Sequence, residues 1–467
     1  MPKKLIRRDM PAPLPTDRDP KEPTCGCCGE SKVILSRRAF LRRATSSAAA
    51  ATLVGLFPHM LFNHRQAFAA NNAGKTLVVV FQRGGNDGLN TIVPYSDPEY
   101  YVVRPRPTVV GNGIGVAPPG SGDGAGLDMA GTGFAMHPSL QPLHSLYTNG
   151  TLAIITRGGF VGSTQSHFTD QDTLERGVFS MQDGWLNRYL QAVPAAGSPN
   201  IRAAGIGSDL ADSLRGAFLV PAVSSLSQLS FARLGSSKAP LEANLRAIYG
   251  QSAGATTTNP YRSLVHALGP DMLNRVAAIE AIGPAVPQNG ASYPGSGFGS
   301  QLRDLAHLIR AGMGLEVATV DIGGWDTHED QGAGGTFGQS QASRLADFAG
   351  GLRAFHDDLG PLMNNVVVLT CTEFGRTVRQ NASNGTDHAK ATVWFAFGGG
   401  VRGGLYHGSG WVPSLIPANL DEGRYIAPTV EFRDIYADVL TRHFGVTAGE
   451  LGAVLPGHTH RPVGLFG

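Results

Sequence analysis

The sequence predicts an α/β protein: a three-layer sandwich with a mostly parallel central sheet between helices. Short apolar runs rich in β-branched and aromatic residues recur along the chain with turn-forming residues at their ends, as in buried strands. Helical patterns lie between several of these runs, and this alternation is typical of parallel sheets joined by helical crossovers. The expected strands are 76–81, 152–156, 201–206, 317–322, 366–369 and 393–397.

The expected helices fill the intervals between the strands. In one of them, Leu302, Leu305 and Ile309 recur at helical spacing and make an apolar face. The expected helices are 140–147, 241–249, 263–282, 301–309, 339–363 and 431–444. Residues 104–136 are rich in Gly and Pro and are interpreted as a long excursion. Residues 200–300 are interpreted as an insertion or cap that covers or borders the site.

The composition indicates a folded protein without an affinity for nucleic acid. At 467 residues the chain exceeds what one hydrophobic core usually supports, and 42% hydrophobic residues exclude wholesale disorder. Residues 1–69 hold 12 of the 38 basic residues and 5 of the 36 acidic ones. The remaining 26 basic and 31 acidic residues leave the rest mildly acidic, so nothing attracts it to a polyanion.

The first 69 residues have the pattern of a twin-arginine signal peptide and leader. SRRAFL at 36–41 contains the paired arginines, and an apolar run follows from 44 to 62. AFA at 67–69 is the small-x-small pattern that a signal peptidase reads. The twin-arginine translocase is therefore the expected partner during export, and the mature protein is expected to be periplasmic or secreted.

A transmembrane anchor is the alternative interpretation of the apolar run. A membrane span needs about 20 strongly apolar residues, whereas this run opens with polar residues and is broken at Pro58. We therefore expect cleavage near Ala69, no stable anchor afterwards, and one α/β domain over 70–467. Cys371 would be the sole cysteine left, so an internal disulfide is excluded.

Charged and imidazole side chains follow several of the expected strands. Ligands of parallel α/β sheets bind in the crevice beyond the carboxyl ends of the strands. Each residue alone is also explained as an ordinary loop residue, but carboxylates packed together repel one another unless a cation binds. The candidate metal ligands are Asp87, Asp326, His328, Glu373, Asp387 and His388.

Asp326 and His328 have a spacing that favours metal binding. In extended backbone, residues i and i+2 point the same way, so both side chains can reach one ion. Carboxylate and imidazole suit zinc, manganese or iron, whereas magnesium and calcium seldom bind His. We expect one or two divalent transition metal ions, zinc or manganese before others.

The candidate catalytic residues are two hydroxyls and an arginine. Ser166 stands where a helix begins, either as its N-cap or as a nucleophile, and Thr91 is the second candidate nucleophile. Arg376, with Arg83 as the alternative, would offer bidentate donors to an anion. GGGVRG at 398–403 fits a dinucleotide-binding pattern, but no helix follows it, and we reject that site. Serine hydrolase elbows, HExxH and P-loops do not occur in the sequence.

Several short stretches follow the twin-arginine leader in a characteristic order: RGGNDGLNT, SHF, GGWDTH, TEFGR, GTDH and FGGGVRGG. In this order they resemble the bacterial family of exported proteins called DUF1501, and the match covers nearly the whole chain after about Thr76. That family has no settled activity but is similar to the alkaline phosphatase and sulfatase superfamily. The resemblance therefore implies an alkaline phosphatase-like fold.

The superfamily pattern can be placed on individual residues. Its first strand-end aspartate resembles Asp87, and its Asp-x-x-x-His pair resembles the tighter pair of Asp326 and His328. Its Thr-Ser-Asp-His strand end puts Glu373 in the aspartate position, and its late histidine resembles His388. Two metal sites are implied, the first from Asp326, His328 and His388 and the second from Asp87, Glu373 and Asp387.

One departure from the superfamily pattern weakens the second site. Phe374 stands where the superfamily usually has a histidine for the second metal. The expected function is an exported metal-dependent hydrolase of phosphate or sulfate esters, with a small anionic ester as substrate. The alternative is a binding or scaffold protein at the cell surface, on a hydrolase fold that has lost activity.

Overall fold

The computed structural model describes residues 74–107, 113–178, 180–195, 201–226, 235–250, 260–332 and 341–467. All of them fall within one compact unit, Thr52–Gly467. The expected signal peptide and leader lie outside the described residues. Within the described residues, no helix is both long and apolar enough to cross a membrane.

A central sheet forms the middle of the unit. Its strand order is β11-β5-β10-β9-β1-β8-β6-β7, and β12 pairs with β5. The strands are β1 (Thr76–Gln82), β5 (Leu152–Gly159), β6 (Ala203–Ile206), β7 (Ala222–Val223), β8 (Val317–Ile322), β9 (Val366–Cys371), β10 (Thr392–Gly398), β11 (Gly404–Tyr406) and β12 (Val430–Glu431). The predicted strand 317–322 is confirmed at both ends, and the others are confirmed with small shifts of their ends.

The sheet is mostly parallel, with one exception. β1 pairs in parallel with β8 and β9, and β6 does so with β8. β10 pairs antiparallel with both β5 and β9. The connection from β9 to β10 therefore starts and ends at the same edge of the sheet, where β1, β5 and β8 also end. The βαβ unit expected from strand 317–322, helix 339–363 and strand 366–369 is confirmed, because β8 and β9 both pair in parallel with β1 and a helix, Gln341–Leu359, connects them.

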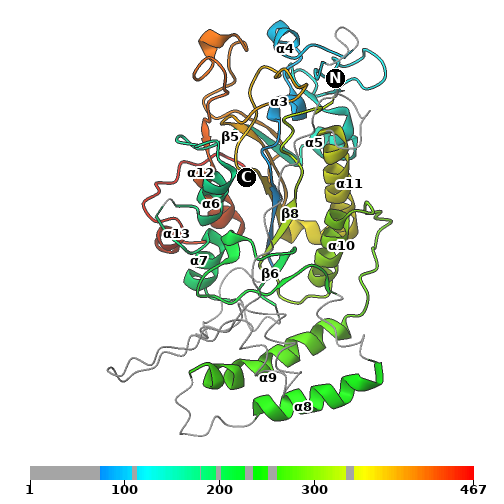
Figure 1. Cartoon of the computed structure of the whole chain (residues 1–467), viewed down its shortest axis with the longest axis vertical. Helices are drawn as coiled ribbons and strands as arrows, with labels where there is room; N and C mark the ends of the chain where they lie inside the picture. Colours follow the sequence, from blue (N-terminus) through cyan, green and yellow to red (C-terminus); the bar gives the residue numbers. More distant parts are fainter. Residues whose placement is uncertain are drawn as a thin grey trace, which may run out of the picture. The chain divides into compact units, whose positions relative to one another are not determined.

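Helices lie on both faces of the sheet (Figure 1). On one face are α5 (Gln141–Thr148), α10 (Gly297–Arg310) and α11 (Gln341–Leu359). On the other are α6 (His167–Arg176), α7 (Trp185–Ala192), α12 (Phe432–Asp438) and α13 (Ala448–Val454). The predicted helix 431–444 is divided, because a π-helical turn, Val439–His443, follows α12.

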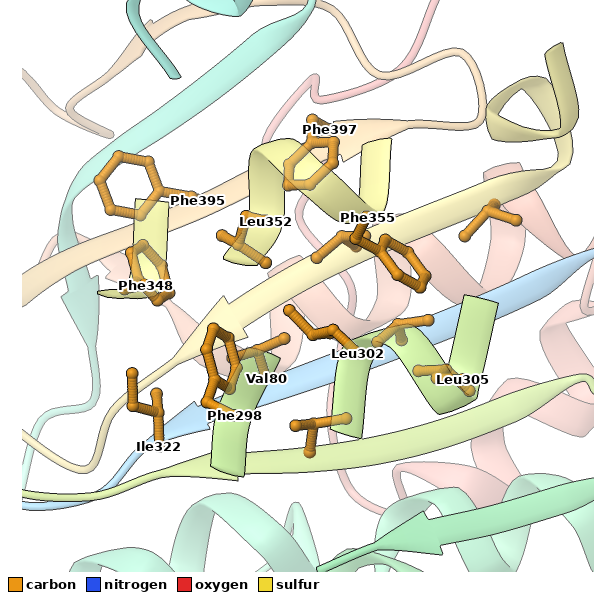
Figure 2. Packing of buried hydrophobic residues seen from close by; sticks show 14 of the residues in the cluster. Val80, Phe298, Leu302, Leu305, Ile322, Phe348, Leu352, Phe355, Phe395 and Phe397 are labelled. Carbon is orange, nitrogen blue, oxygen red and sulfur yellow. The ribbon is translucent and has the colours of Figure 1, made fainter. Parts of the chain in front are cut away.

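Alternating residues of the strands divide the core into two clusters. Val78 and Val80 of β1 face the cluster that contains α5, α10 and α11, whereas Leu77 and Val79 face the other. This is the two-residue period of a strand buried on both sides. Figure 2 shows the first cluster, where residues of α10 and α11 pack over β1, β8 and β10.

The remaining elements lie between or beside these layers. Two short helices, α3 (Gly88–Thr91) and α4 (Pro98–Val103), follow β1. The excursion contains a small sheet of β2 (Ile92–Val93), β4 (Ala135–Met136) and β3 (Leu127–Asp128). The stretch expected to be an insertion or cap supplies β6 and β7 to the central sheet. It also contains α8 (Lys238–Gly250) and α9 (Pro260–Ala281), which contact each other.

Candidate metal centre

Three loops at one edge of the sheet bring four side chains together. His167 begins α6 after β5, Asp326 and His328 follow β8, and His388 lies in the connection from β9 to β10. Asp326 Oδ1 lies 3.1 Å from both His328 Nε2 and His388 Nε2, and Asp326 Oδ2 lies 3.4 Å from His167 Nε2. The structure therefore brings Asp326, His328 and His388 together, as the sequence predicted, and adds His167.

The register of the sheet and two glycines hold these loops close. β1 lies between β8 and β9, so the loop that follows β1 passes beside the loops that follow β8 and β9. Gly84 and Gly85 there have φ angles of 123° and 76°. A Cβ on Gly84 would lie 2.6 Å from the main-chain nitrogen of Asp326, and one on Gly85 would lie 2.6 Å from the ring of Phe374. Both the conformation and the close approach therefore require glycine.

Each imidazole is oriented by an acceptor on its Nδ1 atom. His167 Nδ1 lies 2.7 Å from Glu373 Oε1, and His388 Nδ1 lies 2.8 Å from the carbonyl oxygen of Gln165. His328 Nδ1 lies 3.2 Å from Asp387 Oδ1. Carboxylate and carbonyl oxygens only accept, so these contacts favour the tautomer with the proton on Nδ1, although the Asp326 carboxylate on the Nε2 side is an acceptor as well. In the neutral rings all three Nε2 atoms then have a free lone pair directed toward Asp326.

In this tautomer none of the three Nε2 atoms carries a hydrogen that it could donate to another Nε2 atom or to Asp326. His328 Nε2 and His388 Nε2 lie 2.9 Å apart, and two neutral acceptors at that distance repel each other. His167 Nε2 is buried and has no hydrogen-bond partner among the described residues. Such an orphaned buried nitrogen is unfavourable unless something binds it. A cation shared by the Nε2 atoms and the carboxylate would satisfy all of them.

The distances and donor types fit a transition metal. The ligand atoms of His167, Asp326 and His388 all lie within 4.8 Å of one another, and His328 Nε2 lies outside this group of three but 3.1 Å from Asp326 Oδ1. In a tetrahedral zinc site with bonds of about 2.0–2.1 Å, ligand atoms lie about 3.3 Å apart. The separations of 2.9–3.4 Å around Asp326 are close to that value. Three imidazoles with an outer acceptor on each ring are typical of protein zinc sites.

Arg376 keeps the central carboxylate ionised. Burial raises the pKa of Asp326, but the hydrogen bond and the charge of Arg376 outweigh it and hold that pKa at about 2. Arg376 Nη2 donates to Asp326 Oδ1 at 2.6 Å. The remaining donors of Arg376 go to main-chain oxygens of Gly84, Gly85, Trp325 and Thr386.

This placement corrects the role expected for Arg376. Its side chain has no exposed surface and each of its three nitrogens donates to an oxygen of the protein, so it is not placed to meet an ester anion. It is a positioning residue for Asp326. The alternative, Arg83, forms ion pairs with Glu175 and Asp321 and donates to Gln171, but its side chain is 26% exposed.

The centre is walled on one side and open on the other. Phe374 is fully buried, and its ring lies 4.8 Å from the ring of His167 and 4.6 Å from that of His388. By contrast, the side chains of Asp326 and His328 are 45% and 42% exposed. An ion held there would have an apolar floor and an open side for a small ligand.

Glu373 and Asp387 lie behind the histidines instead of beside them. Glu373 Oε1 accepts from His167, Gln171 and the main chain of Gly84. Burial raises the pKa of Glu373, but these hydrogen bonds together lower it, and the bond to Glu373 raises the pKa of His167. Asp387 Oδ1 is engaged by Asn381 and His328. Both carboxylates contact candidate ligands from behind, and the structure does not place either of them among the candidate ligands.

Asp87 belongs to a different network. Its Oδ2 accepts from Arg104 at 2.6 Å in an ion pair that is almost fully buried, and also from Gln331. Within the described residues, Asp87, Glu373 and Asp387 form no group with ligand spacing. The structure thus does not assemble the second metal site that the sequence predicted, and Phe374 occupies part of the space beside the first.

The two candidate nucleophiles differ in access. Thr91 is fully buried, and its hydroxyl contacts Asn86 Oδ1 and the carbonyl oxygen of Asp87. It is therefore a structural group, which corrects the expectation. Ser166 is the N-cap residue of α6 and is half-buried, but its side chain makes no capping bond. It directly precedes His167 and follows Gln165, so it remains a candidate.

Sequence reasoning missed His167. Asp170 binds the main chain of Thr164 and Gln165 before α6, and this fixes the start of the helix that presents His167. Gln171, one turn later, donates to the same Glu373 oxygen as His167. A histidine and a glutamine four residues apart just after a strand were the available signal, because such residues share a helix face.

One family matches this chain. The profile of the family described as "Protein of unknown function (DUF1501)" matches residues 160–455. The chain belongs to the DUF1501 family. The matched region contains all four candidate ligands and the residues that orient them, so the centre lies inside the part that defines the DUF1501 match. No curated protein matches the chain.

Proposed function

We propose that this DUF1501 protein is an exported metal-dependent hydrolase of phosphate or sulfate esters. One divalent transition metal, zinc or manganese, would be held by His167, Asp326, His328 and His388. The observation that carries the proposal is the set of three Nδ1-anchored imidazoles whose Nε2 atoms face one ionised carboxylate. The orphaned Nε2 atom of His167 supports it.

The chemistry follows from the side chains present. When bound, a divalent transition metal polarises an ester oxygen and stabilises negative charge in an in-line displacement. Glu373 holds the Nδ1 proton of His167 and so leaves Nε2 free to bind. Arg376 keeps Asp326 charged and fixed. Ser166, which is half-buried and directly precedes His167, would supply the attacking hydroxyl: its oxygen would bond to the phosphorus or sulfur atom and displace the alcohol, and water would then release the phosphate or sulfate.

Export and the superfamily relationship belong to the same proposal. The mostly parallel sheet with helices on both faces is compatible with an alkaline phosphatase-like fold. The twin-arginine pattern at 36–41 supports export to the periplasm or beyond. A small anionic ester suits a centre that has one open side and an apolar floor at Phe374.

The decisive experiment measures metal and turnover together. We expect about one equivalent of zinc or manganese in the purified protein, and hydrolysis of at least one member of a panel of aryl phosphates, phosphodiesters and aryl sulfates. His328→Ala should lose both, whereas the control His144→Ala, at a partly exposed position of α5, should keep both. Retention of metal and turnover in His328→Ala would contradict the proposal.

A second candidate function is a metal-binding protein without catalysis. It is favoured by the burial of Thr91 and Arg376, which removes two of the expected catalytic groups from the open side. The same experiment separates the two candidates. Stoichiometric metal that depends on His328, with no turnover of any panel member, would favour the binding protein.

A further inference from the structure

A recess of about 220 Å³ adjoins the metal centre. One side is the segment 377–381, the arm of the β9–β10 connection that runs antiparallel to the arm carrying His388. The other side is the turn containing Gly423 and Arg424, whose carbonyl oxygen accepts from the main chain of Val378. The recess is therefore built by the same connection that presents a candidate ligand.

Asp387 connects the recess to the centre. Asp387 is one of the lining residues, and its Oδ1 atom contacts His328 Nδ1 at 3.2 Å and Asn381 Nδ2 at 3.0 Å. A group bound in the recess would thus lie one side chain away from the candidate ligand His328. Because Asp387 lies on the Nδ1 side of His328, a substrate at the centre would have to extend past the ring of His328 to reach both places.

The charge of the recess is positive. Two arginines, Arg379 and Arg424, line it, and Asp387 is the one acidic residue among the lining residues. Both arginines are exposed, and neither forms an ion pair with a carboxylate in the described part of the chain. Arg424 packs over the ring of Tyr425 at 5.3 Å, which holds its guanidinium near the turn. Two unpaired guanidiniums are suited to a carboxylate, sulfate or phosphate group.

The rest of the lining is partly polar, from Thr377, Gln380 and Asn381, and partly apolar. Val103, Val378, Leu415 and Leu420 contribute hydrocarbon surface between the arginines and the wall of the recess. This surface would contact the carbon atoms of a ligand in which a short chain joins two charged groups. The lining therefore suits an anionic group attached to a short carbon chain better than it suits a free inorganic ion.

We propose that this recess holds a second anionic group of the substrate, and that Arg379 and Arg424 bind it. The inference rests on the proposed function, in which the first anionic group, the ester, binds at the metal. It makes the two arginines specificity-determining residues and narrows the substrate class to esters with a further carboxylate, sulfate or phosphate.

The test compares non-hydrolysable probes by isothermal titration calorimetry on the zinc-loaded, full-length protein. Methylphosphonate carries one anionic group, whereas the ω-phosphonocarboxylates with one to four methylene groups carry a second at increasing distance. We expect at least one chain length to bind about tenfold more tightly than methylphosphonate, the gain expected for one charge-assisted pair. In the double variant Arg379→Gln/Arg424→Gln the ratio of the two affinities should fall to about one.

Arg461→Gln is the matched control, because Arg461 is an exposed arginine on the C-terminal segment, and it should keep the tenfold ratio. Equal melting temperatures would show that the double variant is folded. A ratio near one in the wild type, or a ratio that survives in the double variant, would overturn the recess assignment alone. Failure of zinc-loaded wild type to bind methylphosphonate would refute the ester-binding centre, and the second subsite with it.

Discussion

His167 Nδ1 lies 2.7 Å from Glu373 Oε1, and this one contact decides which nitrogen of the ring faces Asp326. Without an acceptor at Glu373, either tautomer of His167 would be available and the ring could rotate. The carboxylate is almost fully buried, so its orientation is fixed by Gln171 and by the main chain of Gly84. The orientation of the candidate ligand His167 therefore depends on a residue that would not itself reach an ion.

Glu373→Gln should weaken metal binding without removing it. The amide keeps one acceptor oxygen but loses the charge that makes His167 a stronger ligand, so affinity should fall about 10–100-fold. Competition with a chromophoric chelator measures this. Glu316→Gln is the control: Glu316 is also a buried carboxylate, but it precedes β8 at the opposite edge of the sheet. Equal metal affinity of Glu373→Gln and wild type would contradict the role given to Glu373.

Arg376→Lys should lower stability more than it changes substrate binding. Lysine cannot reach the four carbonyl oxygens and the carboxylate that the guanidinium contacts, so buried acceptors lose their donors, at a cost of about 2–4 kcal/mol. Urea unfolding measures the loss. Arg379→Lys, three residues away and exposed, should stay within about 0.5 kcal/mol of wild type. An unchanged stability with a raised KM would instead restore the anion-binding role.

The two hydroxyl candidates should respond in opposite ways. Thr91→Val removes buried hydrogen bonds and should cost about 1–2 kcal/mol of stability while turnover of the folded fraction persists. Ser166→Ala should leave stability within about 0.5 kcal/mol, because its side chain makes no capping bond, yet reduce turnover at least about 100-fold. Thermal unfolding and single-turnover kinetics distinguish them. Full activity in Ser166→Ala would exclude this serine as the nucleophile.

Stability should fall between pH 6.5 and 4 because of two buried histidines. Burial lowers the pKa of both His137 and His443 to about 4. The unfolded chain, with ordinary histidines, binds more protons in that window, so the stabilisation is complete above pH 6.5 and is lost as the pH falls toward 4. Each histidine can contribute on the order of 3 kcal/mol.

Urea unfolding as a function of pH checks this expectation. His137→Asn retains an acceptor near the Nδ1 position, and His443→Gln retains a donor near Nε2, where the native contacts are made. The double variant should show a flatter stability profile over the same window. A wild-type profile as flat as that of the double variant would contradict the burial argument.

The sequence predicted most strands of the central sheet but not the direction of every strand. An unbroken apolar run such as 366–369 is buried whatever the direction of the neighbouring strands, so the sequence alone predicts a strand there. The sequence does not predict the antiparallel pairing of β10, because the run 393–397 would look the same in a parallel strand. The short connection between these strands, which lacks a helical pattern, was the available indication.

Part of the candidate centre could be predicted, and part could not. The proximity of the Asp326 and His328 side chains could be predicted because it depends only on local backbone geometry. The roles of Glu373 and Asp387 could not, since a carboxylate that binds an ion and one that orients a histidine differ only in tertiary placement. Arg376 was assigned to the substrate because no sequence pattern reveals that carbonyl oxygens of Gly84 and Gly85 take its donors.

The four candidate ligands come from three loops, and only Asp326 and His328 are near neighbours in the chain. A denatured chain would offer an ion this single pair, which is a weak chelator. An ion bound by all four would therefore act as a long-range cross-link that favours only the folded state, and each tenfold excess of ion over its dissociation constant would add about 1.4 kcal/mol to that state. Loading must then follow assembly of the sheet, because the site does not exist until β5, β8 and β9 are in place.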